Sequence, residues 1–173
     1  MKDVMDVVAK PEAKEITLIR WFNAPRSLVW RAWTEPAHVA RWWGPMENPV
    51  CQLDLRIGGA YRIVMRSPDG IDYPLTGTFL EVRPIERLVL TMDTTEHPAE
   101  WQHLLNTYRG ARKNEGIEPL EMTVLFGEQD GGTNLTVVAR FATVDDRDAH
   151  LTMGTTKGWS MSFDRLQALL QAL

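Results

Sequence analysis

The order of apolar and polar residues predicts a β-sheet before it points to any chemistry. Along seven segments the two kinds of residue alternate with a period of two, which is the pattern of half-buried strands. Turn sequences separate several of them, such as Gly-Gly at 58–59 and Ser-Pro-Asp-Gly at 67–70. We therefore expect strands at 15–22, 50–56, 60–66, 75–83, 87–93, 120–128 and 133–141, the last six as an antiparallel meander.

Four other segments carry the three- to four-residue apolar spacing of amphipathic helices. Two of them are short, follow the first strand, and end at the Gly44-Pro45 pair. A third interrupts the meander, and the fourth occupies the C-terminus as one long helix. The expected helices are 27–33, 37–43, a helix within 98–113, and 145–173.

This order of elements predicts an α+β fold in which a curved antiparallel sheet of about seven strands wraps around the C-terminal helix. A sheet that closes on a helix leaves a wedge, which is either filled with side chains or kept for a ligand. The chain of 173 residues is long enough for one sizeable core. We expect a single domain over 15–173 and a mobile N-terminal arm over 1–14.

Composition narrows the class of protein. The formal net charge of −4 and the lack of a clustered Lys/Arg run argue against nucleic-acid binding. Cys51 is the only cysteine, so no disulfide can form within the chain. Residues 1–14 lack the apolar stretch of a secretory signal, and no apolar run of about 18 residues predicts a membrane span. A cytoplasmic protein is the simplest interpretation.

Several motifs carry a resemblance that extends over nearly all of 15–173. They begin with ITLIRWFNAPRSLVWRAWTEPAHVARWWGP at 16–45. They continue with Asp54 and Arg56, Gly58-Gly59, Pro68-Asp69-Gly70, Gly77, Pro84 with Glu86-Arg87-Leu88, and Gly158-Trp159. Together they resemble the activator of heat-shock protein 90 ATPase homologue-like family of the START-like, birch-pollen-allergen-like (SRPBCC) superfamily. The segment 94–118 is longer than expected in a minimal member.

The resemblance implies a helix-grip fold with a cavity between the sheet and the terminal helix. It also implies a role in holding apolar small molecules and, for some eukaryotic relatives, stimulation of a chaperone. The shared motif residues look structural, so the resemblance brings no catalytic set with it.

The adjacent tryptophans of RWWGPM, Trp42 and Trp43, cannot face the same way on a helix, because neighbouring positions lie about 100° apart. Large aromatic residues are usually buried, which favours the core for Trp30 and Trp42. Trp33 and Trp43 lie beside the Gly-Pro exit, and we expect them in the cavity wall.

Methionine and aromatic residues take many of the alternate strand positions that face the core, where compact Val and Ile are the alternative. Adaptable side chains of this kind line ligand sites more often. We therefore expect an internal ligand cavity. The predicted ligand-binding residues are Trp33, Trp43, Tyr61, Met65, Phe79, Met92, Met122, Trp159 and Phe163.

The histidines do not predict a metal site. His97, Glu100 and His103 are three residues apart, which differs from the i, i+4 histidine pair of zinc-enzyme helices. We expect them on a solvated helix face, and we expect His38 and His150 at the surface. No metal and no cofactor are predicted.

Candidate catalytic groups are few. Cys51 lies in an alternating strand, where a buried, inert thiol is usual. Glu81 and Asp54 are carboxylates within strands, so either one facing inward would be a candidate acid or base. The alternative that we favour is an outward position or an ion pair with Arg20, Arg56 or Arg62. No catalytic residue is assigned.

The helix within 98–113 carries an apolar stripe that must pack somewhere, because soluble proteins rarely leave such a patch uncovered. Two partners stay open. The stripe covers the mouth of the cavity as a lid, which we favour slightly, or it meets a second copy in a homodimer. The stripe is Trp101, Leu104, Leu105 and Tyr108.

We therefore expect a cytoplasmic protein that binds an apolar or aromatic small molecule in an internal cavity. Two alternatives remain, a cochaperone-type interaction domain and a cyclase- or hydrolase-like enzyme of the same superfamily. An inward Glu81 or Asp54 would favour the enzyme.

Overall fold

A computed structural model describes residues 4–110 and 115–173, and these form an α+β fold. The eight strands of the described chain build one antiparallel sheet in the order β1-β2-β8-β7-β6-β5-β4-β3. The strands are β1 (Asp6–Val8), β2 (Glu15–Phe22), β3 (Val50–Leu53), β4 (Ala60–Arg66), β5 (Asp72–Arg83), β6 (Arg87–Met92), β7 (Leu120–Gln129) and β8 (Gly132–Arg140). The helices are α1 (Arg26–Thr34), α2 (Pro36–Trp42), α3 (Ala99–Tyr108), α4 (Val144–Thr152) and α5 (Thr155–Ala172).

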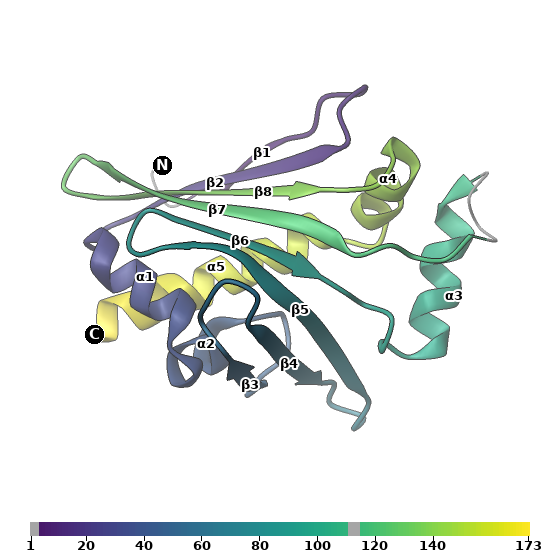
Figure 1. Cartoon of the computed structure of the whole chain (residues 1–173), viewed down its shortest axis with the longest axis horizontal. Coiled ribbons are helices and arrows are strands. Elements are labelled where there is room, and N and C mark those ends of the chain that lie inside the picture. The colour runs from purple at the N-terminus through teal and green to yellow at the C-terminus, as the bar shows by residue number, and fades with distance from the viewer. Residues whose placement is uncertain (1–3, 111–114) are drawn as a thin grey trace.

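The helix-grip arrangement predicted from the sequence is confirmed. The sheet curves around α5, with α1 and α2 at one end of this helix and α4 and α3 at the other (Figure 1). Strand β2 shows why the sheet faces α5. Every second residue of it is buried, and the buried Arg20 donates a hydrogen bond of 2.7 Å to Asp164 on α5.

Curvature comes from the middle of the sheet. The register between β5 and β6 shifts between Phe79 and Glu81, and a bulge of this kind bends a strand. Close to it, a Cβ on Gly77 would lie only 2.0 Å from the carbonyl oxygen of Thr91. Only glycine allows the backbone segments to approach this closely.

The C-terminal segment differs from the prediction of one helix starting at Asp145, which is wrong at that end. It forms α4 and α5, separated at Gly154, whose φ of 90° is in the left-handed region. A left-handed glycine ends a helix and lets the chain change direction. The long C-terminal helix that packs on the sheet is therefore α5 alone.

Part of the segment expected to be an N-terminal arm packs against the rest of the fold. Residues 6–8 pair with β2 as the edge strand β1, and the buried Arg147 of α4 donates to the carbonyl groups of Lys10, Pro11 and Ala13. Residues 1–3 of the expected arm, and residues 111–113 of the expected inserted helix, lie outside the described residues. The described part of that helix ends at Tyr108.

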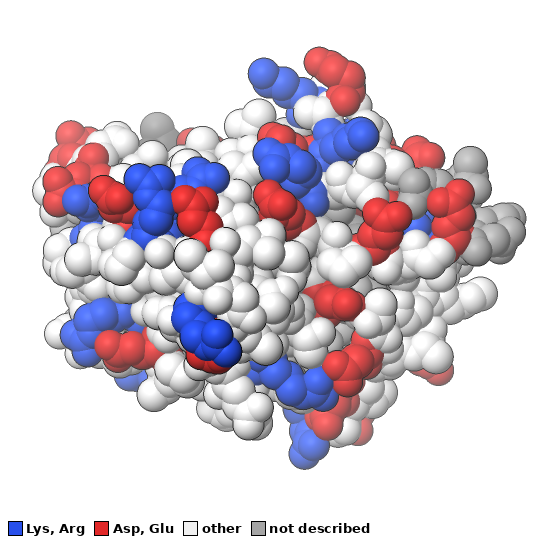
Figure 2. All heavy atoms as spheres, viewed as in Figure 1, with Lys and Arg blue, Asp and Glu red and all other residues white. Residues whose placement is uncertain are grey.

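Positive and negative side chains are intermixed on the face shown in Figure 2. Many of them form ion pairs, such as Arg140 with Glu15 at 2.9 Å and with Glu121 at 3.2 Å. Within the described ranges, no helix combines the length and the apolar character needed to cross a membrane.

Candidate functional site

The two tryptophans at the end of α2 separate as expected. Trp42 is fully buried and its indole Nε1 donates a hydrogen bond of 2.7 Å to the carbonyl oxygen of Ala32 on α1. Trp43 follows the last helical residue and turns toward α5, where its ring lies 5.4 Å from that of Trp159. Trp42 thus joins α2 to α1, while Trp43 reaches the wedge between the sheet and α5.

The loop after Trp43 is fastened to α5. Gly44 has a φ of 74°, which disfavours a larger residue, and a Cβ there would lie 2.2 Å from the sulfur of Met65 unless that side chain moved. The guanidinium of Arg165 donates to the carbonyl oxygens of Gly44, Pro45 and Met46, at 3.0, 3.1 and 2.7 Å. These contacts fix the position of Trp43 at one wall of the wedge.

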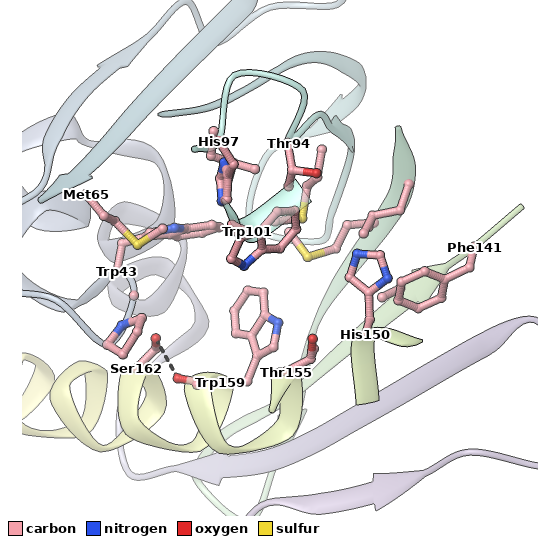
Figure 3. Close-up of a pocket in the computed structure, with 18 residues that line it drawn as sticks. Trp43, Met65, Thr94, His97, Trp101, Phe141, His150, Thr155, Trp159 and Ser162 are labelled. Atoms are coloured by element: carbon pink, nitrogen blue, oxygen red, sulfur yellow. Dashed lines mark hydrogen bonds between the residues drawn. The ribbon is translucent and has the colours of Figure 1, made fainter. Parts of the chain in front are cut away.

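The wedge contains a pocket of about 180 Å³, which Figure 3 shows and which we call the wedge pocket. Its walls come from the sheet, the loop after α2, the segment that includes α3, and helices α4 and α5. The lining residues are Trp43, Gly44, Pro45, Met65, Leu75, Met92, Thr94, His97, Trp101, Leu120, Met122, Ala139, Phe141, His150, Thr155, Gly158, Trp159 and Ser162.

The pocket exists because α5 presents small residues in its first half. Thr155, Gly158 and Ser162 line it, and nothing lies within 4 Å of the position that a Cβ on Gly158 would take. In the second half the buried residues include Phe163 and Leu166, which fill the space under the sheet. The same helix therefore leaves room at one end and closes it at the other.

Five of the nine residues predicted to bind a ligand line the wedge pocket, namely Trp43, Met65, Met92, Met122 and Trp159. The structure places the other four in the packed core. Trp33 stacks on Trp159 at 6.1 Å, Phe163 packs edge-on against Phe22, and the Tyr61 ring lies 5.5 Å from Phe79. They face inward as predicted, but they lie farther along the wedge, where large side chains meet.

The apolar stripe of α3 divides into two halves. Trp101 lines the pocket and Leu105 is fully buried, whereas Leu104 and Tyr108 are 44% and 43% exposed. Trp101 therefore faces the wedge, and Leu105 is covered by the protein without lining the pocket. The other two face solvent.

A buried ion pair holds α3 against α4. The guanidinium of Arg109, at the end of α3, donates through Nε to a carboxylate oxygen of Asp146 at 2.8 Å, and both side chains are nearly inaccessible. Its other nitrogens donate to Asn106 and to the carbonyl oxygens of Glu115 and Gly116. One buried cation thus fixes the position of Trp101 relative to α4.

The expectation that His97 and His150 lie on solvated surfaces is wrong. His97 precedes α3 and accompanies Trp101 in the pocket wall, and His150 enters the pocket from α4. The spacing within 97–103 did not reveal this, because the partners of each histidine come from other elements. His103 is exposed, and His38 pairs with Glu35 at 2.9 Å.

The candidate catalytic groups lie elsewhere. Asp54 pairs with Arg56 at 2.8 Å, and Glu81 pairs with Arg87 at 2.9 Å, so neither carboxylate lines the wedge pocket. Burial raises the pKa of the Cys51 thiol to about 11, which leaves it protonated and unreactive at neutral pH. Among the described residues, no group of three or more His, Cys, Asp or Glu side chains could hold a metal ion.

Solved structures share this fold. Protein NE0264 from Nitrosomonas europaea is 27% identical, with a TM-score of 0.75 over 95% of this chain and 97% of that one. Protein CV1439 from Chromobacterium violaceum is 25% identical, with a TM-score of 0.65 over 91% and 96%. A protein from Rhodobacter sphaeroides is 21% identical, with a TM-score of 0.79 over 98% and 99%.

No curated protein matches the chain. The profile of one family, described as activator of Hsp90 ATPase homolog 1-like protein, matches residues 23–171. This match covers most of the motifs that suggested the resemblance and confirms it. The chain therefore belongs to the family of activator of Hsp90 ATPase homolog 1-like proteins.

Proposed function

We propose that this protein binds an apolar or aromatic small molecule in the wedge pocket. The observation that carries the proposal is a space of about 180 Å³ with mostly apolar walls between the sheet and α5. A cavity of roughly 150 Å³ with apolar walls is large enough to bind benzene. The wedge pocket therefore suits a ligand of about one aromatic ring with small substituents.

Most of the affinity for a ligand would come from apolar contact with the side chains around the pocket. Met92, Met122, Leu120 and Phe141 offer apolar contact, and each Å² of apolar surface removed from water contributes roughly 25 cal/mol. Trp101 of α3 covers the pocket from the inserted segment. We propose that α3 is the lid of this site, which its Trp101 in the pocket wall supports.

Binding is better supported than catalysis. The described residues place no carboxylate in the pocket wall, and the carboxylates of Asp54, just after β3, and of Glu81 in β5 pair with arginine side chains. An acyl- or glycosyl-transfer reaction needs a nucleophile or a pair of acids with different environments. The cochaperone alternative has only the family description in its favour. Its test is to add the purified protein to the chaperone and to measure whether the ATPase activity of the chaperone rises.

The substitution Gly158→Leu tests the binding site. A side chain at this position would enter the open space that a Cβ on Gly158 faces. We expect the Gly158→Leu variant to keep its fold and to bind a small aromatic probe such as toluene at least tenfold more weakly. NMR titration measures the affinity. The matched control Ala168→Leu adds a leucine on the exposed side of α5 and should leave binding unchanged. Equal binding by both variants would refute the site.

Substitutions in the exposed half of the α3 stripe distinguish the lid alternative from the dimer alternative. Leu104→Ser with Tyr108→Ser changes only exposed side chains, so it should leave the fold and toluene binding intact. If the exposed half is a dimer contact, sizing will show a dimer for the parent and a monomer for this variant. If α3 is a lid alone, both proteins will have the same size.

A further inference from the structure

The wedge pocket contains two imidazole rings from separate elements, and this inference rests on the proposed function of that pocket. His97 comes from the segment before α3, and His150 comes from α4 (Figure 3). Both rings lie near the Trp101 indole, with ring centroids 4.5 Å and 6.4 Å from it. Two titratable groups of the pocket wall are therefore grouped around Trp101.

Hydrogen bonds determine which nitrogen of each ring is free. Nδ1 of His97 lies 2.8 Å from the carbonyl oxygen of Pro74, and Nδ1 of His150 lies 2.8 Å from that of Asp146. A carbonyl oxygen only accepts, so Nδ1 carries the proton in both rings. In the neutral imidazole, Nε2 is then an acceptor. The described residues donate no hydrogen bond to either Nε2.

The surroundings of both rings favour the neutral form. Burial is the largest effect and lowers the pKa of His97, against its hydrogen bond to Pro74 and the charge of Asp93, while the other histidine lowers it further. For His150, burial again lowers the pKa, opposed by Asp146 and assisted by Arg109. At neutral pH the pocket thus presents two acceptors and no charge from these rings.

These acceptors select among aromatic ligands. A carboxylate would meet two lone pairs, and a cation would lose its hydration without finding an acidic residue among the described lining residues. A neutral hydroxyl group can donate to Nε2 and so replace the hydrogen bond that water entering the pocket would make. We propose that the wedge pocket prefers compact, uncharged aromatic ligands that carry a hydroxyl group, which donates its one hydrogen to Nε2 of His97 or of His150.

Two probes of nearly the same shape test this preference. 4-Methylphenol and 1,4-dimethylbenzene differ by a hydroxyl in place of a methyl group. Their affinities for the full chain are measured by NMR titration at neutral pH, and the quantity of interest is the ratio of the two. His97→Phe and His150→Phe keep a ring beside Trp101 but remove the acceptor. Removal of the acceptor that the hydroxyl uses should lower the ratio of 4-methylphenol to 1,4-dimethylbenzene affinity by roughly 3- to 10-fold, so we expect this change in at least one of the two variants.

The control variant is His103→Phe on the exposed face of α3, which should leave the ratio unchanged. A second measurement needs no variant. The ¹⁵N signal of at least one of the two unprotonated Nε2 atoms should shift when 4-methylphenol binds, and both signals should stay in place when 1,4-dimethylbenzene binds.

The outcomes are distinguishable. If neither probe binds the parent chain, the proposed function itself fails. If both bind while the ratio is unchanged in the histidine variants, or while the ¹⁵N signals stay in place with 4-methylphenol, the hydroxyl preference is wrong and apolar binding stands. A lowered ratio together with the ¹⁵N shift supports the preference.

Discussion

The two ends of the wedge between the sheet and α5 are built differently. At the end near α1 and α2, the Trp33 ring has neighbours on several sides, among them Trp42 at 4.8 Å and Phe126 at 6.2 Å. At the end near α3 and α4, the rings of Trp101, His97 and His150 surround open space. One end is a close-packed core, and the other is a pocket with polar groups.

The difference shows that the pocket depends on side-chain size along one helix as well as on sheet curvature. The inward residues of α5 change from Thr155, Gly158 and Ser162 to Phe163 and Leu166. Trp43 and Trp159 lie where the two regions meet, with ring centroids 5.4 Å apart. If this account is correct, substitutions at the packed end should change stability most, and substitutions at the open end should change binding most.

The largest expected effect is at the packed end. Trp42→Ala removes a fully buried ring together with its hydrogen bond to Ala32, and it should lower the free energy of unfolding by about 3–5 kcal/mol. Trp101 is partly exposed and buries less apolar area, so Trp101→Ala should lower the free energy of unfolding by only about 1–2 kcal/mol. Urea unfolding measures both. Equal losses would remove the distinction between the two ends.

The next effect tests how the open end is held together. Arg109→Met leaves Asp146 as a buried carboxylate without its main cation, which should cost about 3 kcal/mol. Hydrogen exchange should become faster in α3 and α4 and stay slow in the second half of α5. Arg140→Met is the control, because its ion pairs are half-exposed and contribute less than about 1 kcal/mol. Uniformly faster exchange would mean that the ion pair supports the whole fold.

A smaller effect follows from pH. In the folded state the pKa values of His97 and His150 are lower than the ordinary 6.5. As the pH falls below 6.5, the unfolded chain therefore binds more protons than the folded chain does. Stability is therefore fully present above pH 6.5 and is lost as the pH falls through the folded pKa values, by up to about 1.4 kcal/mol per pH unit for each histidine. Unfolding curves at pH 7.5 and pH 5 should differ less in the variant with both histidines changed to phenylalanine. Parallel pH dependence in both proteins would contradict the burial of these rings.

The smallest effect compares two glycines at the open end. Gly158→Ala lies in a helix with free space around the new methyl group, so it should stabilise the protein by about 0.5–1 kcal/mol. Gly154→Ala should destabilise it by about 1 kcal/mol, because the φ of 90° there disfavours a side chain. Thermal unfolding measures both changes. A gain at Gly154 would mean that the break between α4 and α5 is not needed.

Much of the fold was predictable because its signals are local. Alternation with a period of two placed seven strands, since successive side chains of a strand point to opposite faces. The pair Trp42 and Trp43 was correctly divided between core and pocket wall from helix geometry and the Gly44-Pro45 break. The start of α5 was missed because the sequence does not distinguish a glycine inside a helix, such as Gly158, from one with left-handed backbone that ends a helix, such as Gly154.

The candidate site was predictable only in part. Periodicity tells which face of a strand is inward, and this was enough to identify Met65, Met92 and Met122. It does not tell how far along the wedge a residue lies, so Tyr61 and Phe79 were included although they belong to the packed end.

The sequence by itself determined most of the strands and helices, which of their faces are apolar, and the family resemblance, because each of these depends on near neighbours in the chain. Only the tertiary structure decided that His97 and His150 lie beside Trp101, and that Arg109 is neutralised by Asp146. Those residues are brought together by the packing of α3 against α4, and the energy of that packing comes from contacts between segments far apart in sequence. The physical reason is that a side chain's neighbours across a fold leave no periodic trace in the chain around it.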